Sequence, residues 1–208
     1  MTSGKSNVCI IDYGFGNVNS VYNAFKSFHD SVMVSNDAKD MEKATHLVLP
    51  GVGAFKAAID KIKKMPTFEL LEYSVLNKKK MFLGICVGMQ VLADVGHEHG
   101  SCDGLGWIPG AVKRINAPNL SLPHVGWNNI RVVRKSPLLE GMSDNTDFYY
   151  VHSYHLEPLN SEEMMASSNY GEEFAAIVNR DNIYGVQFHP EKSQKAGIML
   201  LKNFMSLK

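Results

Sequence analysis

The chain has 208 residues with 21 basic and 21 acidic side chains, so its formal net charge at pH 7 is zero. This balance gives no electrostatic reason to expect binding to nucleic acid or an anionic membrane. No stretch approaches the ~20 consecutive apolar residues of a membrane span. The length predicts one α/β domain over residues 1–208. No apolar signal segment opens the sequence, and the three cysteines form no CxxC pair, which favours the cytoplasm.

The first half alternates short apolar runs with segments of helical spacing. We predict strands at 8–11, 31–34, 46–49 and 81–83, and helices at 17–28, 54–64 and 67–77. Short, fully apolar strands between helices indicate a parallel sheet covered on both faces. Because chemistry in such sheets lies at the carboxyl ends of the strands, segments 12–16, 50–53 and 84–88 are expected on one rim.

The second half is richer in strands. Strand-like runs occupy 111–115, 129–133, 148–156, 175–179 and 183–188, and helical spacing returns only at 196–207. Asn179-Arg180-Asp181-Asn182 is typical of a hairpin turn. We therefore expect a mainly parallel central sheet flanked by helices, with an antiparallel extension, within one α/β domain.

The segment 84–90 reads Gly-Ile-Cys-Val-Gly-Met-Gln and directly follows the predicted strand at 81–83. A glycine two residues either side of Cys86 permits a tight strand-to-helix turn, the arrangement of a nucleophile elbow. The turn is expected to aim the thiol at solvent from a helix N-terminus, where unpaired amides favour the thiolate. The alternative, a small buried core cysteine, leaves both glycines without a purpose.

A cysteine nucleophile needs a base and a group that orients the base. His189 follows the predicted strand at 183–188, and its imidazole can accept the thiol proton if that strand ends beside Cys86. Glu191 is expected to bind the other ring nitrogen, and Pro190 to stiffen the pair. A solvated His-Pro-Glu turn is the alternative for this segment taken alone.

Two further groups complete the predicted site. The backbone amides of Val52, Gly53 and Val87 are expected to hold a developing oxyanion, because glycines beyond a strand end allow amides to turn inward. A plain loop is the alternative for the glycine-rich stretch. Gln90, one helical turn after Cys86, is expected to bind the amino-acid end of a substrate; an exposed polar residue is the alternative there.

These motifs closely resemble those of the class I glutamine amidotransferases, whose glutaminase domains use a Cys-His-Glu triad. The matching residues are Cys86, His189 and Glu191, together with the oxyanion segment at 50–53. Within that family, the chain resembles the glutaminase subunits of imidazole glycerol phosphate synthases from about residue 8 onward. That closer resemblance rests on DYGFGN at 12–17, PGVGAF at 50–55, GLGWIPG at 104–110, PHVGWN at 123–128, YYVHSY at 149–154 and HPEKS at 189–193.

The resemblance implies an enzyme that hydrolyses L-glutamine through the triad without a cofactor or metal. It implies that Glu98 binds the α-ammonium group of glutamine and that His152, Ser153 and Tyr154 line the carboxylate side. It further implies a heterodimer with a (β/α)₈ cyclase, which receives the ammonia and makes imidazole glycerol phosphate and AICAR in histidine biosynthesis. The implied partner contacts are Asn17, Trp127, Asn128, Tyr149 and Lys192.

Other interpretations stay open from the sequence. The chain could feed ammonia to another synthase, for example one that aminates a sugar, although PHVGWN argues against an anthranilate type. It could also be an inactive regulatory or binding subunit, or a stand-alone cysteine hydrolase. Trp127 could be a core aromatic and Lys192 a solvated lysine. His97-Glu98-His99 lacks a third ligand motif, so we expect no metal there.

Overall fold

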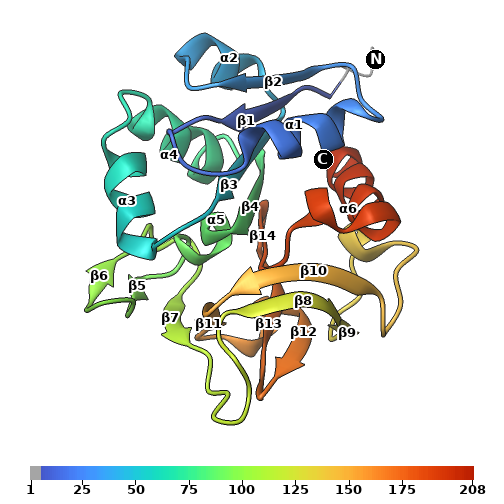
Figure 1. The fold of residues 1–208 in the computed structure, drawn as a ribbon. Helices are drawn as coiled ribbons and strands as arrows, with labels where there is room; N and C mark the ends of the chain where they lie inside the picture. Colours follow the sequence, from blue (N-terminus) through green and yellow to red (C-terminus); the bar gives the residue numbers. More distant parts are fainter. Residues whose placement is uncertain (1–5) are drawn as a thin grey trace.

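The computed structural model describes residues 6–208 and centres on an eight-stranded sheet with the order β2-β1-β3-β4-β14-β13-β12-β9 (Figure 1). The parallel part contains β1 (Val8–Ile11), β2 (Val32–Ser35), β3 (His46–Gly51), β4 (Met81–Cys86) and β14 (Ile183–Val186). The antiparallel part contains β13 (Glu172–Arg180), β12 (Met164–Tyr170) and β9 (Arg131–Val132). The predicted parallel sheet with an antiparallel extension is confirmed.

Helices cover this sheet, and two smaller sheets extend it. The helices are α1 (Val18–Lys26), α2 (Ala38–Lys43), α3 (Phe55–Lys63), α4 (Phe68–Leu76), α5 (Val87–Gln90) and α6 (Gln194–Ser206). Figure 1 shows α3 and α4 to the left of the central strands and α6 to their right. Single 3₁₀ turns are η1 (Pro137–Leu139), η2 (Ser161–Glu163) and η3 (Pro190–Lys192).

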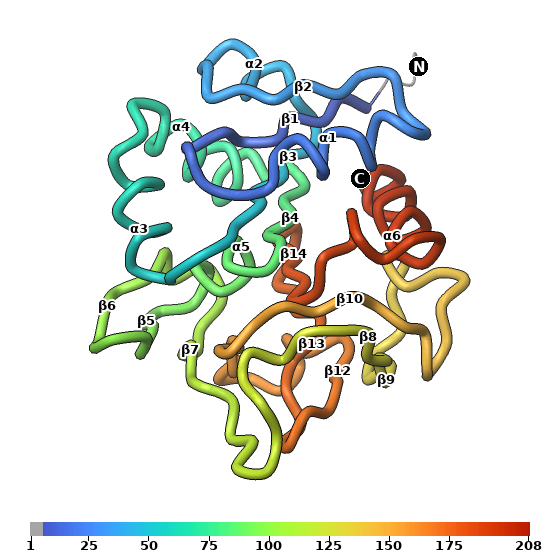
Figure 2. Tube along the Cα trace, viewed as in Figure 1, coloured from blue at the N-terminus to red at the C-terminus, as the bar shows by residue number. Residues whose placement is uncertain are grey.

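In Figure 1 β8 and β10 appear beside the lower strands of the central sheet, β12 and β13, whereas β5 and β6 lie at the left; Figure 2 traces the chain through them. An antiparallel ribbon pairs β8 (His124–Asn129) with β10 (Asp147–His152). A four-stranded sheet contains β11 (Tyr154–Pro158), β7 (Gly110–Arg114), β5 (Val95–Gly96) and β6 (Cys102–Asp103). Among residues 6–208 no helix combines the length and apolarity that a membrane crossing requires.

Several element boundaries differ from the sequence prediction. The predicted strand at 129–133 is wrong, because β8 ends at Asn129 and β9 starts at Arg131 in a different sheet. The predicted strand at 148–156 breaks at Ser153 in the same way. Strand β12 was not predicted because its sequence, MMASSNY, is half polar. Its serines are nevertheless buried, since their hydroxyls donate to a carboxylate on β13 and to a backbone carbonyl of β8.

The parallel register gathers the strand ends at one edge of the sheet. Gly51 of β3 lies opposite Cys86 of β4, and Val186 of β14 lies opposite Ile85 of the same strand. The segments that leave β3, β4 and β14 therefore emerge side by side. The chain after β14 carries His189, which this register brings toward the end of β4.

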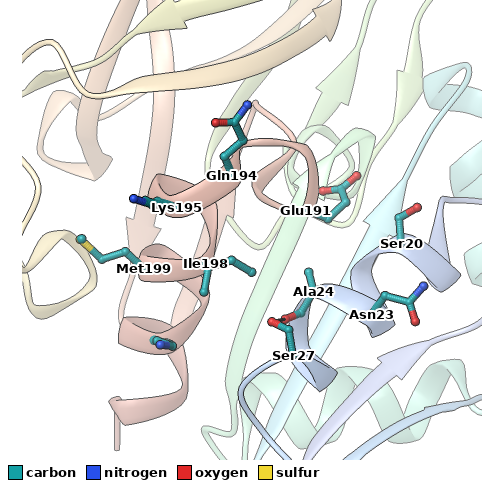
Figure 3. Close-up of a pocket in the computed structure, with 10 residues that line it drawn as sticks. Ser20, Asn23, Ala24, Ser27, Glu191, Gln194, Lys195, Ile198 and Met199 are labelled. Atoms are coloured by element: carbon teal, nitrogen blue, oxygen red, sulfur yellow. Dashed lines mark hydrogen bonds between the residues drawn. The ribbon is translucent and has the colours of Figure 1, made fainter.

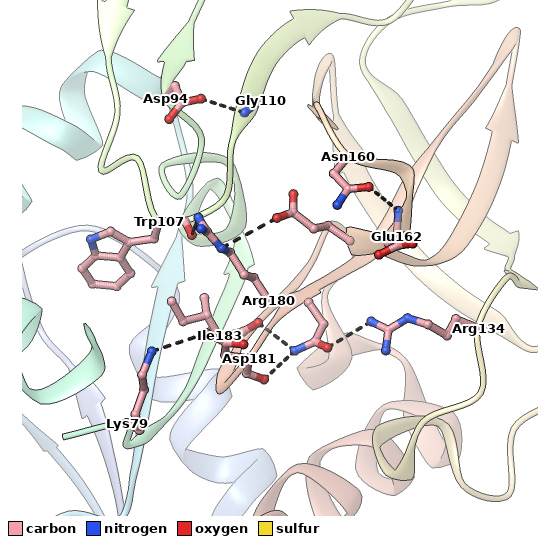
Figure 4. Close-up of polar contacts among 12 residues, drawn as sticks. Lys79, Asp94, Trp107, Gly110, Arg134, Asn160, Glu162, Arg180, Asp181 and Ile183 are labelled. Carbon is pink, nitrogen blue, oxygen red and sulfur yellow. Dashed lines mark hydrogen bonds and ion pairs between the residues drawn. The ribbon is translucent and has the colours of Figure 1, made fainter. Parts of the chain in front are cut away.

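The hairpin between β13 and β14 fixes that register. Arg180 pairs with Ile183, and the turn places Asp181 at φ 52°. Nδ2 of Asn179 donates to the carbonyl oxygens of Asp181 and Ile183 at 2.9 and 3.1 Å. The guanidinium of Arg180 donates to the carbonyl of Trp107 at 3.2 Å (Figure 4). The hairpin turn predicted at 179–182 is confirmed.

Candidate active site

Cys86 ends β4, and its own backbone makes the turn into α5. Its φ of 55° and ψ of −112° lie in a region that non-glycine residues rarely adopt. The flanking glycines do not make this turn; they allow neighbouring backbone segments to approach closely. A Cβ on Gly88 would lie 1.9 Å from the carbonyl oxygen of Leu49, and one on Gly84 would lie 2.3 Å from that of Gly88. The glycines thus let α5 pack directly on β3 and β4.

The thiol does not point at open solvent, so that expectation is wrong. Cys86 is only 3 % exposed and forms part of the wall of a pocket of about 250 Å³. The thiol donates to the carbonyl oxygen of Val151 at 3.8 Å. The helix that follows is a single four-residue turn, so its dipole contributes less than a long helix would.

His189 and Glu191 lie together beside Cys86. Nδ1 of His189 is 2.9 Å from Oε1 of Glu191, and the two side chains are 5 % and 1 % exposed. Burial disfavours the imidazolium, but hydrogen bonding to Cys86 and Glu191 outweighs it and raises the pKa of His189 to about 10. Because the carboxylate of Glu191 accepts from Nδ1, that nitrogen carries a proton. Nε2 is then the nitrogen that can accept the thiol proton of Cys86.

Ser193 holds the His189 backbone against the β8–β10 ribbon. Its hydroxyl donates to the carbonyl oxygen of His189 at 2.7 Å and accepts from the amide of Tyr149 at 3.0 Å. The amide of His189 in turn donates to the carbonyl oxygen of Tyr149 at 2.8 Å. A Cβ on Gly197 would lie 1.8 Å from the carbonyl oxygen of Pro190, so α6 packs tightly behind the same turn. The base is therefore held by contacts with β10 and with the start of α6.

The structure brings the predicted site residues to one pocket. Its walls include two of the three predicted catalytic residues, all three predicted oxyanion residues and all five predicted substrate residues: Cys86 and His189; Val52, Gly53 and Val87; Gln90, Glu98, His152, Ser153 and Tyr154. Glu191 stands behind His189, outside the pocket wall. The remaining wall residues are Val151 and Lys192.

Two predicted substrate residues also bind the protein itself. Oε2 of Glu98 accepts from the amide of Phe55 at 2.7 Å. This contact caps α3, because the N-cap residue Ala54 has no side-chain acceptor. Nε2 of Gln90 donates to the carbonyl oxygen of Tyr154 at 2.8 Å and to Oε1 of Gln187 at 3.1 Å. The amide oxygen of Gln90 makes no hydrogen bond within residues 6–208, and it belongs to a side chain that lines the pocket.

A buried chain of hydrogen bonds behind the pocket was not predicted. Nδ1 of His152 lies 2.9 Å from the carbonyl oxygen of Tyr154, and its Nε2 lies 3.0 Å from Nδ1 of His124. Because a carbonyl only accepts, His152 carries its proton on Nδ1 and accepts at Nε2 from His124. Nε2 of His124 then accepts from Nδ2 of Asn128 at 3.4 Å. The period-2 alternation of β8, with Trp127 outward and His124 inward, could have indicated this.

Gln187 and Tyr13 are further residues that the sequence analysis missed. Gln187 is fully buried, and its Nε2 donates to Sγ of Cys86 at 3.8 Å. Its position two residues before His189, on the same side of an extended chain, was the available signal. Tyr13 is 5 % exposed, and its hydroxyl has no partner among the described residues. Burial, with a further contribution from Cys86, raises the pKa of Tyr13.

Four of the five predicted partner contacts lie on or beside the β8–β10 ribbon. Trp127 is in strand β8, and it is 49 % exposed, which excludes a core position. Its ring meets that of Tyr149 at 6.0 Å, and the ammonium group of Lys192 lies 5.8 Å from the Tyr149 ring centroid. Asn128 is half-buried, with its side chain on the inner face of β8 toward His124, and Asn17 stands at the N-cap of α1.

A wider groove of about 950 Å³ lies between α1 and α6 (Figure 3). It reaches Glu191 but neither Cys86 nor His189, and Figure 3 shows Ser20 and Ala24 on one wall and Ile198 and Met199 on the other. We therefore place the chemistry in the smaller pocket, which contains the nucleophile. Within residues 6–208 no group of three or more His, Cys, Asp or Glu side chains is arranged to hold a metal ion.

Comparisons with known proteins agree with this geometry. Residues 9–207 match the sequence profile of the family described as glutamine amidotransferase class-I. The chain is 42 % identical over 201 residues to the imidazole glycerol phosphate synthase subunit HisH 1 of Campylobacter jejuni, covering 96 % of this chain and 100 % of that protein. It is 44 % identical over 202 residues to subunit HisH of Bdellovibrio bacteriovorus, covering 95 % and 98 % respectively.

Solved structures show the same fold. One described as a glutamine amidotransferase matches with a TM-score of 0.72 at 18 % identity, covering 95 % of this chain and 97 % of that one. A glutamine amidotransferase from Thermotoga maritima matches with a TM-score of 0.64 at 19 % identity, covering 95 % and 83 % respectively.

Proposed function

We propose that this chain, which belongs to the class I glutamine amidotransferase family, hydrolyses L-glutamine as the glutaminase subunit of an imidazole glycerol phosphate synthase. The observation that carries the proposal is that Cys86 and His189 line one pocket, with Glu191 bonded to His189 from behind. They follow strand ends that the parallel register brings together. The identity to HisH subunits over almost the whole length of both chains supports the pathway, histidine biosynthesis.

The proposed reaction uses Cys86 as the nucleophile. The thiol proton passes to His189, and sulfur attacks the γ-carboxamide carbon of glutamine to give a tetrahedral intermediate. His189 then protonates the departing nitrogen, the C–N bond breaks, and ammonia leaves a thioester on Cys86. Water, deprotonated by His189, attacks the thioester; the C–S bond breaks and releases glutamate. Glu191 keeps the imidazole in one tautomer throughout.

Substrate recognition follows from the polar groups on the pocket wall. The amides of Val52, Gly53 and Val87 are proposed to hold the oxyanion of the tetrahedral intermediate. The free oxygen of Gln90 and the carboxylate of Glu98 are proposed to face the α-ammonium group. His152, Ser153 and Tyr154 are proposed to line the carboxylate side. A zwitterionic ligand needs such partners, because an unpaired buried charge is costly.

Ammonia becomes a poor nucleophile once protonated, so the product has to be delivered without release. We propose that a (β/α)₈ cyclase subunit docks on Asn17, Trp127, Asn128, Tyr149 and Lys192. This surface carries an exposed tryptophan, a common interface anchor. Lys192 both lines the pocket and stands over Tyr149, which makes the surface continuous with the pocket mouth.

The test is reconstitution from purified components. The chain should be copurified with its natural partner, the partner identified by mass, and glutamine-dependent synthesis measured in the complex. Formation of imidazole glycerol phosphate from glutamine and the cyclase substrate is expected. Copurification with a sugar-aminating synthase, and no reaction with the cyclase, would assign the chain to a different pathway while keeping the glutaminase chemistry.

A further inference from the structure

Gln187 lies directly beneath the nucleophile without facing the substrate pocket. It follows β14, is fully buried, and is not part of the pocket wall. Its Oε1 accepts from Nε2 of Gln90 at 3.1 Å, and its Nε2 donates to Sγ of Cys86 at 3.8 Å. Burying an amide is costly unless both its oxygen and its NH₂ group form hydrogen bonds, and here the NH₂ group bonds to sulfur.

The orientation of the Gln187 amide is determined by its neighbours. Nε2 of Gln90 donates to the carbonyl oxygen of Tyr154 at 2.8 Å, and a carbonyl can only accept. Nε2 of Gln90 is therefore a donor on both of its contacts, so the atom of Gln187 that meets it is the oxygen. The NH₂ group of Gln187 is then the end that faces Cys86.

The two contacts of the sulfur favour different protonation states. The carbonyl oxygen of Val151, 3.8 Å from Sγ, can accept from a thiol but repels a thiolate. The NH₂ group of Gln187 donates, so it favours the thiolate, which is the nucleophilic form. Without that donor, the sulfur would keep its contact with the carbonyl oxygen of Val151.

We propose that Gln187 is part of the catalytic machinery: its NH₂ group holds the Cys86 thiolate, and Gln90 positions that NH₂ group. The inference rests on the proposed glutaminase function for its role in the reaction. The donor would stabilise sulfur before the C–S bond forms, and again when that bond breaks and the electron pair returns to sulfur. Before the C–S bond forms, His189 holds the proton lost from the thiol. When that bond breaks, His189 holds the proton taken from water and can return it to sulfur.

Other titratable groups surround the sulfur, and a test must hold them constant. They are His189, Glu191 and Lys192 after β14, His152 on β10, Tyr154 on β11, Glu98 after β5, and Tyr13 after β1. None of these residues is itself replaced in a variant at residue 187. A shift in the reactivity of Cys86 can therefore be assigned to the amide.

The test is the pH profile of Cys86 alkylation by iodoacetamide, followed by intact mass. Cys102 is half-buried and should be changed to serine in every protein, whereas burial raises the pKa of Cys9 to about 12 and keeps it unreactive. In Gln187→Met, the pH of half-maximal alkylation is expected to rise, with about tenfold slower alkylation near neutrality, since a hydrogen bond to a charged group is lost. The kcat for glutamine hydrolysis should fall similarly, with KM little changed.

Two further variants separate this role from a structural one. Gln187→Glu keeps the size and the contact with Gln90 but presents oxygen to sulfur, so its profile should shift further in the same direction. Asn182→Leu removes a buried amide at the other end of β14, where Nδ2 donates to the carbonyls of Val75 and Lys80 at 2.9 and 2.7 Å. It should lower the melting temperature without moving the alkylation profile.

An unchanged alkylation profile in either Gln187 variant, or an equal shift in Asn182→Leu, would overturn the inference. Alkylation does not involve glutamine, so the inference and the proposed function can fail separately. A protein that does not hydrolyse glutamine, but whose profile shifts in Gln187→Met, would contradict the function and retain the sulfur contact. A protein that hydrolyses glutamine, but whose alkylation profile is unchanged in Gln187→Met, would support the function and contradict the role of Gln187.

Discussion

His124 donates a hydrogen bond from Nδ1 to Nε2 of His152 across 3.0 Å, in the buried layer behind the substrate pocket. Because Nδ1–H of His152 donates a hydrogen bond to the carbonyl oxygen of Tyr154, each ring uses one nitrogen as donor and one as acceptor. A second proton on either ring would remove an acceptor. The arrangement therefore requires both histidines to be neutral, and burial lowers their pKa values to about 4 for His124 and about 3 for His152.

This pair predicts a loss of stability in mild acid. An unfolded histidine has a pKa near 6.5, so the unfolded chain binds more protons than the native one as pH falls below that value. The free energy of unfolding should decrease from about pH 6.5 toward pH 4, by up to roughly 1.4 kcal/mol per pH unit per histidine. Urea unfolding over this range measures the slope.

The matched controls are His124→Gln and His97→Gln. The first removes one buried titratable ring and should flatten the pH slope, although it lowers stability at neutral pH. The second changes an exposed histidine and should leave the slope as in the wild type. A slope that is the same in all three proteins would show that the two buried rings do not control acid stability.

Cys86→Ala is predicted to abolish glutamine-dependent synthesis while preserving the fold and the partner complex. The variant removes the covalent route, but ammonia added to the solution can still enter the synthase directly. Synthesis should be measured in the complex with glutamine and, separately, with ammonium salt. Glutamine-dependent turnover by this variant would rule out the proposed mechanism.

His189→Ala and Glu191→Gln should both slow glutamine hydrolysis, the first more than the second. Loss of a general base typically costs about 10²–10⁴-fold in rate, whereas glutamine at 191 can still accept from Nδ1 of His189 and loses only the charge. Single-turnover measurements of the isolated acylation step would separate the two roles. Equal rates for wild type and His189→Ala would place the base elsewhere.

Much of this arrangement could be predicted because parallel strands end at a common edge. Apolar runs placed β3, β4 and β14 in the sheet, and the chemistry then followed from the residues after each strand end. The contacts of Gln187 and His124 could not be predicted, because they depend on side chains from elements far apart in sequence. The positive φ of Cys86 could not be predicted either, because the sequence analysis assigned the tight turn to the flanking glycines. The break at Ser153 could not be predicted either, because it depends on which sheet each half joins.

Ser193→Ala is predicted to impair catalysis through the backbone of His189. The substitution leaves the amide of Tyr149 and the carbonyl of His189 without their shared hydroxyl, a cost of about 1–3 kcal/mol in stability. The kcat should fall, with KM nearly unchanged, because the pocket wall is intact. Ser206→Ala, which removes an exposed hydroxyl bound to the carbonyl of Asn203, is the control and should change neither quantity. Wild-type kcat in Ser193→Ala would show that His189 is held by other contacts.

The isolated chain is predicted to be a poor glutaminase that becomes active on binding its cyclase partner. Gly53 adopts φ 84°, and a Cβ there would meet only the ring of Phe15 at 3.7 Å, so this strand end is loosely packed. Val52, beside it, is 39 % exposed. A loosely packed strand end need not hold its amides toward the oxyanion, and a missing donor costs about 10²–10³-fold in turnover. Lys192 lines the same pocket, so a partner that docks beside it can contact this segment. If those contacts form only when the amides of residues 52 and 53 point inward, docking favours that conformation.

Glutamine turnover should therefore be measured for the chain alone, for the complex, and for the complex with the cyclase substrate bound. A stepwise rise is expected, carried mainly by kcat, because the oxyanion forms only in the transition state. Gly53→Ala forces an L-residue into a left-handed conformation, at a cost of about 1–2 kcal/mol, and should bias the segment away from its present geometry. The ratio of complexed to free activity should therefore differ between this variant and the wild type. Full activity in the isolated wild-type chain, unchanged by the partner, would refute this gating while leaving the assignment of Cys86, His189 and Glu191 intact.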